Sequence, residues 1–148
     1  MDLPGVRDET QALAEALRPA LLRVSRRLRR EAQKAGVSAL DAQLLTVIGK
    51  APGIGGAALA DHEQMTRPSM SSHLKRLEGA GWIARDPVQD DDRRRVGVRL
   101  TRTGAAALDA IRRRRNDWLA ERLANLSTAE RAALAAATSA LAQLAEDR

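Results

Sequence analysis

Apolar residues recur every three or four positions along the first quarter of the chain, which is the spacing of one face of a helix. Between about residues 7 and 35 these residues are Leu13, Leu17, Leu21, Val24 and Leu28. Pro19 lies within this run and lacks a backbone donor, so it predicts either a kink or the start of the main part of the helix. Gly36 ends the predicted helix.

Three short helices are predicted to follow in close order. The first has an N-cap at Ser38, three residues before Asp41, and an apolar face formed by Leu40, Leu44, Leu45 and Ile48. The segment AALADHEQ, residues 57–64, supplies one or two further turns. The third helix begins in the sequence TRPSMSSHLKRLEGAGW, where Thr66 is its cap and Pro68 is tolerated in its first turn.

After Gly81 the period of the pattern changes from about four to two. In the segment RVGVRLT, Val96, Val98 and Leu100 alternate with Gly97 and Arg99, which is typical of a half-buried strand. A charged loop, QDDDRRR, joins this segment to the preceding WIARDPV. The pattern predicts a β-hairpin with a charged tip.

The helical pattern returns at Thr101 and continues to about Leu126. Its apolar stripe consists of Leu108, Ile111, Trp118 and Leu119. Ser127 with Glu130 forms a capping box for a last, alanine-rich helix. The predicted fold is therefore mostly α with a small β-hairpin: a winged helix-turn-helix over 37–101, flanked by long helices over 1–36 and 102–148, in one compact unit. The flanking helices carry more leucine and alanine than one small core can cover, so they are predicted to be dimerisation helices.

Size and composition narrow the function. The 148 residues suffice for one domain, and 25 Lys and Arg against 19 Asp and Glu give a net charge of +6 and favour a polyanionic partner. Aromatic residues make up only 1% of the chain, so a platform that stacks single-stranded bases is not expected, and duplex DNA is the better partner. The absence of Cys excludes disulfides and thiolate chemistry, and with no signal peptide or membrane span expected, we predict a cytoplasmic protein.

The helix after Thr66 has a face suited to the major groove. Met70, Leu74 and Leu77 share one side and are predicted to be buried. Short hydroxyls on the other side allow close approach, while Lys and Arg can bind phosphates or guanine acceptors. The candidate DNA-binding residues of this helix are Arg67, Ser69, Ser71, Ser72, His73, Lys75 and Arg76. Arg93, Arg94 and Arg95 at the hairpin tip suit the narrow minor groove.

The stretch from Ala58 to Gly104 resembles the DNA-binding core of the MarR family of bacterial regulators. The resemblance rests on the RP at the start of the third helix, LE..G at its end, D.R in the hairpin and LT..G after it. It implies that Arg94 enters the minor groove and that Asp92 orients it. It further implies an obligate homodimer that binds a pseudo-palindromic operator, and a repressor that a small aromatic or amphipathic acid often releases.

Several features have plainer interpretations. We interpret Arg112 to Arg115 as the solvent-exposed face of a long helix, and Trp118 as a core or dimer contact rather than part of a ligand site. His62 and His73 are not spaced as metal ligands, so neither a metal nor a cofactor is expected.

No enzyme is expected either, because the chain has no P-loop, no glycine-rich dinucleotide turn and no acid pair placed for catalysis. The alternative function is that of an architectural or non-ligand-responsive DNA-binding or interaction protein. Such a protein would bind most duplexes nearly equally, whereas a regulator prefers its operator by about a thousandfold or more.

Overall fold

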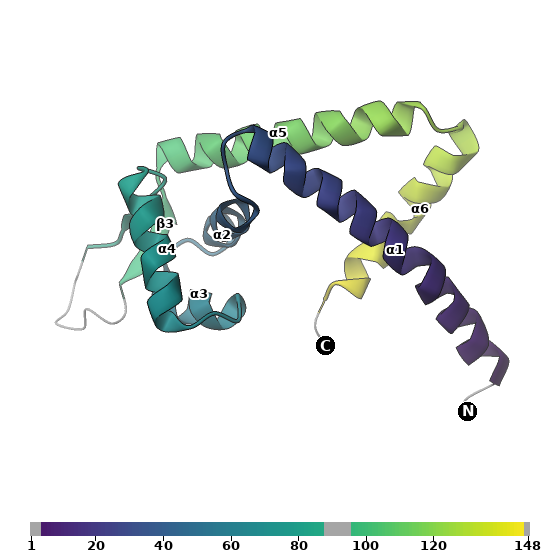
Figure 1. Cartoon of the computed structure of the whole chain (residues 1–148), viewed down its shortest axis with the longest axis horizontal. Helices are drawn as coiled ribbons and strands as arrows, with labels where there is room; N and C mark the ends of the chain where they lie inside the picture. Colours follow the sequence, from purple (N-terminus) through teal and green to yellow (C-terminus); the bar gives the residue numbers. More distant parts are fainter. Residues whose placement is uncertain (1–3, 88–95, 147–148) are drawn as a thin grey trace.

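The computed structural model describes residues 4–87 and 96–146, and confirms a mostly helical chain with a small antiparallel sheet (Figure 1). Its elements in chain order are α1 (Pro4–Lys34), α2 (Ala39–Lys50), β1 (Ile54–Gly55), α3 (Gly56–His62), α4 (Arg67–Gly79), β2 (Ile83–Arg85), β3 (Gly97–Leu100), α5 (Arg102–Ala124) and α6 (Thr128–Leu144).

The elements form a compact lobe with a helical arm. Helices α2, α3 and α4 gather with the strands at one end, and α5 leads away from this lobe along the top of the view (Figure 1). Helix α1 leaves the lobe beside α5 and then diverges from it, while α6 folds back from the far end of α5. The two chain ends therefore both lie on the arm side.

Side-chain caps define the helix starts that the sequence predicted. Ser38 accepts a hydrogen bond from the Asp41 N–H at 3.1 Å at the start of α2. At α6 the capping box is complete, because Ser127 and Glu130 each accept from the other's backbone N–H. Helix α1 runs through Pro19 from Pro4, so Pro19 does not mark the start of the helix's main part.

The hairpin of β2 and β3 is confirmed, and a third strand joins it. Strand order is β1-β3-β2, all antiparallel, with Ile54 opposite Val98 and Ile83 opposite Leu100. Strand β1 was not predicted, because two residues are too short to show an alternating pattern. It forms where β3 offers a free edge to the chain leaving α2.

The buried residues are confined to the middle of the chain. The main core joins α2, α3, α4, the sheet and the start of α5, and a smaller cluster of Ala32, Val37, Ala42 and Ile111 joins α1, α2 and α5. Among the side chains described, every buried one lies between Glu31 and Ile111. Most of α1, the second half of α5 and all of α6 therefore bury no residue within one chain.

The start of α5 is packed directly on the end of the loop before β2. Thr101 N–H donates to the carbonyl oxygen of Trp82 at 3.0 Å. A Cβ added to Gly104 would lie 1.9 Å from the same oxygen, closer than any side-chain atom can approach. Glycine at this position therefore allows α5 to hold the base of the hairpin.

Candidate nucleic-acid interface

Helix α4 is the predicted recognition helix, and its own sequence determines where it starts and which face it buries. Thr66 Oγ1 accepts from the Ser69 N–H at 3.3 Å, and Pro68 occupies the first turn, where an N–H has no partner in the helix. Met70, Leu74 and Leu77 are at most 2% exposed and anchor α4 on the core. The buried face predicted from their spacing is confirmed.

The opposite face carries the candidate DNA-binding residues. Six are exposed: Arg67, Ser69, Ser71, Ser72, Lys75 and Arg76. His73 is half-buried beside Arg76. The Ser72 hydroxyl donates to the carbonyl oxygen of Pro68 at 3.2 Å, which leaves its lone pairs available to an outside donor. The exposure agrees with the sequence analysis, while the contacts to DNA remain predictions.

The side chain of Arg76 is engaged by a residue outside α4. Its Nη1 and Nη2 donate to Oδ2 and Oδ1 of Asp41 on α2, each at 2.6 Å, and Nη2 lies 3.1 Å from Nδ1 of His73. We expected Arg76 to point away from the protein. Its side chain is 51% exposed, yet the end of its guanidinium is bound to α2.

Asp41 is a buried charged group, with only 4% of its surface exposed. The hydrogen bonds from Arg76 are the main reason that the pKa of Asp41 lies below its usual range, and burial acts in the opposite direction. The same contact raises the pKa of Arg76. The pair is therefore fully ionised at neutral pH.

Two ion pairs stabilise the base of the wing, by which we mean the β2–β3 hairpin. Arg99 Nε donates to Asp86 Oδ1 at 2.7 Å, and Arg85 Nε donates to Glu78 Oε2 on α4 at 2.9 Å. The predicted wing residues Asp92, Arg93, Arg94 and Arg95 lie outside the described residues. Their minor-groove role remains a prediction, whereas the structure describes the base that carries them.

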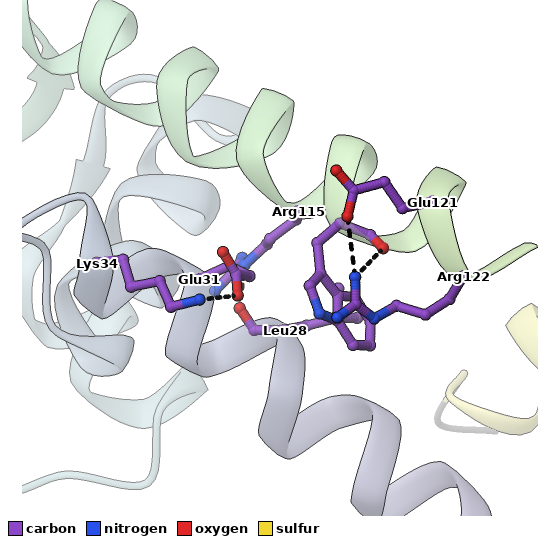
Figure 2. Close-up of polar contacts among 7 residues, drawn as sticks. Leu28, Glu31, Lys34, Arg115, Glu121 and Arg122 are labelled. Carbon is purple, nitrogen blue, oxygen red and sulfur yellow. Dashed lines mark hydrogen bonds and ion pairs between the residues drawn. The ribbon is translucent and has the colours of Figure 1, made fainter.

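A second polar cluster lies between α1 and α5 (Figure 2). Arg115 Nε donates to the carbonyl oxygen of Leu28 at 3.1 Å. Burial lowers the pKa of Arg115, although a guanidinium stays charged at any physiological pH. The expectation that Arg112 to Arg115 are all solvent-exposed is wrong for Arg115, because it lies one helical turn after Ile111 on the face that packs against α1.

Trp118 lies near this cluster and has two arginines close to its ring. The guanidinium carbons of Arg27 on α1 and Arg122 on α5 lie 5.8 and 4.6 Å from its ring centroid. The side chain of Glu31 is 8% exposed, and its carboxylate accepts a hydrogen bond from Lys34 at 2.8 Å. This hydrogen bond is the main cause that lowers the pKa of Glu31. The indole Nε1 is buried with no hydrogen-bond partner among the described residues.

A hollow of about 650 Å³ opens where α1, α2 and α5 meet. Its apolar wall comes mainly from α1, which also supplies Ser25 and Arg29, while α2 and α5 add Gln43 and Arg115. The full lining consists of Leu21, Val24, Ser25, Leu28, Arg29, Ala39, Gln43 and Arg115. Within the described chain, the two terminal nitrogens of Arg115 have no hydrogen-bond partner. The hollow therefore combines apolar walls with two cations, the exposed Arg29 and the half-buried Arg115.

Sequence reasoning missed the supporting residues Asp41, Arg99 and Arg115. The position of Arg115 was available from the apolar stripe, since it falls between Ile111 and Trp118 on one helix face. No sequence signal joined Asp41 to Arg76, because 35 residues separate them.

The described residues contain no group of three or more potential metal-binding side chains among His, Cys, Asp and Glu. In the same part of the chain, no helix has both the length and the apolar character needed to cross a membrane.

Comparison with known proteins agrees with this geometry. Residues 37–96 match the sequence profile of the MarR family. An uncharacterized HTH-type transcriptional regulator from Mycobacterium bovis is 34% identical over 140 residues, which cover 95% of this chain and 97% of that protein. The crystal structure of a candidate transcriptional regulator from Pseudomonas aeruginosa is 32% identical, with a TM-score of 0.81 over 95% of this chain and 98% of that one.

A third relative was crystallised with a small acid. It is a MarR family protein from Mycobacterium tuberculosis, in complex with salicylic acid. It is 28% identical, with a TM-score of 0.60 over 82% of this chain and 93% of that chain.

Proposed function

The chain is a DNA-binding transcriptional regulator of the MarR family, and from that premise we propose that it acts in the cytoplasm as a homodimeric repressor. In this proposal the dimer binds a pseudo-palindromic operator in double-stranded DNA, and a small aromatic or amphipathic acid releases it. The observation that carries the proposal is the polar, hydroxyl-rich outer face of α4, held on the core by three buried residues.

Operator recognition by α4 is supported by its shape and charge. The exposed serines have short side chains, so the helix can approach the floor of a major groove closely. Arg67 and Lys75 can contact phosphates or bases at the edges of this face. The net charge of +6 favours binding to the DNA backbone at any sequence. Selectivity must then come from α4 and the wing.

Homodimer formation is supported by the arm, which lacks a core of its own. Among the residues that the structure describes, the large apolar ones that stay exposed all lie on α1 and α6: Val6, Leu13, Leu21, Leu22, Val24, Leu134 and Leu144. Several large apolar side chains exposed on the same two helices indicate a protein interface. A second copy offers the same surface and would give the two-fold symmetry that a pseudo-palindrome requires.

The hollow between α1, α2 and α5 supports release by a ligand. Its volume of about 650 Å³ suits a small organic molecule, and Leu21, Val24 and Leu28 supply an apolar wall. The terminal nitrogens of Arg115 could bind a carboxylate through two parallel hydrogen bonds. The relative that binds salicylic acid supports an acid of this kind.

A binding titration tests the proposal. The purified protein is titrated on a labelled duplex from the DNA upstream of its own gene, alone and with a panel of phenolic acids that includes salicylate. We expect tight binding that at least one acid weakens. A protein that binds this duplex while no acid of the panel changes its affinity would instead be a regulator without ligand response.

A further inference from the structure

Asp41 is a preorganised acceptor on α2. It occupies the third position of the helix, where its own N–H is bound to the Ser38 hydroxyl at 3.1 Å. A negative charge in the first turn is stabilised by the helix dipole. With its carboxylate buried and ionised, Asp41 cannot turn toward solvent without losing these interactions.

Arg76 meets this carboxylate end-on. Both terminal nitrogens donate at 2.6 Å, which is the parallel two-bond geometry that only a guanidinium forms. The guanidinium can only donate, so Nδ1 of His73, which lies 3.1 Å from Nη2, is the acceptor in this contact. Three of the five guanidinium N–H groups are thereby used within the protein.

The other two N–H groups, on Nε and Nη1, have no partner among the described residues. The side chain remains 51% exposed on the outer face of α4, whereas that of Asp41 is 6% exposed. The bridge therefore fixes the plane of the guanidinium without hiding it. An arginine tied down in this way can make a directional contact with little further loss of side-chain freedom.

We propose that Asp41 is a positioning residue for DNA recognition, which acts by holding Arg76 in the orientation that reads the operator. This rests on the proposed role of α4 as recognition helix. Asp41 does not touch DNA; it aligns the side chain that does. A bridge that served only to stabilise the fold would not need the half-exposed position of Arg76.

The test compares affinity for two probes. One is a duplex that the wild-type protein enriches from a randomised pool, and the other is a scrambled duplex of the same composition. The quantity measured is the ratio of the two affinities, since a partly unfolded sample lowers both in proportion and leaves the ratio unchanged.

Asp41→Asn should lower this ratio about tenfold or more, the loss expected when one well-oriented arginine contact is released. Affinity for the scrambled duplex should stay level or rise, because the variant carries one negative charge fewer. Asp109→Asn is the matched control. It makes the same charge change at an exposed acid on α5, whose side chain is 58% exposed, and should leave the ratio unchanged.

A double-mutant cycle assigns the effect to Arg76. In an Arg76→Ala background, Asp41→Asn should change the ratio no further. Should Asp41→Asn fail to fold, Asp41→Glu replaces it throughout, because it keeps the charge but moves the carboxylate by one methylene.

Two outcomes overturn the inference alone: a ratio that stays within about twofold of wild type, or an undiminished effect without Arg76. A wild-type protein that enriches no duplex would instead overturn the proposed function.

Discussion

Arg115 on α5 donates from Nε to the carbonyl oxygen of Leu28 on α1, at 3.1 Å and across 87 residues of sequence. The bond engages Nε, and Arg115 also lines the hollow between α1, α2 and α5. Two cations line this hollow, Arg29 and Arg115, and of these Arg115 is the less exposed. We therefore expect Arg115 to be the main binding group for an acid.

Replacing Arg115 should separate ligand response from DNA binding. In Arg115→Met the salicylate concentration that half-releases the operator should rise about tenfold or more, because the charged partner of the carboxylate is lost. Operator affinity without ligand should change by less than about threefold. Fluorescence anisotropy titrations measure both quantities, with Arg113→Met as an exposed control on the same helix. An equal salicylate response in the two variants would show that Arg115 is not the binding group.

Local features of the fold were predictable from sequence, since each depends on residues close together in the chain. The caps at Ser38 and Ser127 follow from their spacing to Asp41 and Glu130, and the buried face of α4 follows from helical periodicity. The hairpin was predicted from the alternation in β3, and Figure 1 shows it in the expected place beside α4.

The remaining features depend on tertiary packing. Strand β1 forms because Ile54 pairs with Val98 at the edge of β3. Its two residues are too few to show a strand pattern in the sequence. The bridge between Asp41 and Arg76 requires α2 and α4 to be packed together first. Arg115 was assigned to solvent because its neighbours are charged, although its helical phase pointed to α1.

Gly104, near the start of α5, should not tolerate a side chain. A methyl group there meets the Trp82 carbonyl oxygen, so Gly104→Ala should lower the free energy of unfolding by about 1–3 kcal/mol or more. Gly79→Ala on α4 is the control, because a Cβ there has no heavy atom within 4 Å and alanine favours a helix. Urea unfolding measures the free energy of unfolding of both variants. Equal stabilities would mean that the loop at Trp82 moves to accommodate the methyl group at little cost.

The Asp41–Arg76 bridge should make stability depend on pH in the acid range. The pKa of Asp41 is lowered on folding, so the unfolded chain binds its proton first as the pH falls. The stabilisation is therefore fully present above about pH 4–5 and is lost as the pH falls through the lower, folded-state pKa of Asp41.

Glu31 and Glu130 also have lowered pKa values, so they too contribute to the loss of stability at acid pH. The contribution of Asp41 is therefore obtained by comparing wild type with Asp41→Asn. Urea midpoints measured from pH 7 to pH 2 should fall less steeply for Asp41→Asn than for wild type. Parallel curves for the two proteins would show that the bridge contributes nothing to the pH dependence.

The wing is expected to grip DNA through Arg94, with Asp92 as its orienting partner. Arg94→Ala should flatten the slope of log affinity against log salt by about one unit. Asp92→Ala should weaken operator binding even though it makes the protein more positive. Titrations at several salt concentrations, with Arg113→Ala as the control, measure both effects. Tighter binding by Asp92→Ala would indicate a wing that acts through net charge alone.

Sequence-specific binding by a two-fold dimer is the central claim, and hydroxyl-radical footprinting with scrambled competitor tests it most directly. On the duplex upstream of the protein's own gene, we expect two protected patches related by a dyad, with half-sites about one helical turn apart. Scrambled duplex should compete at least about a thousandfold more weakly than this operator. Uniform protection along the probe, with a preference below about tenfold, would contradict the account and indicate an architectural DNA-binding protein.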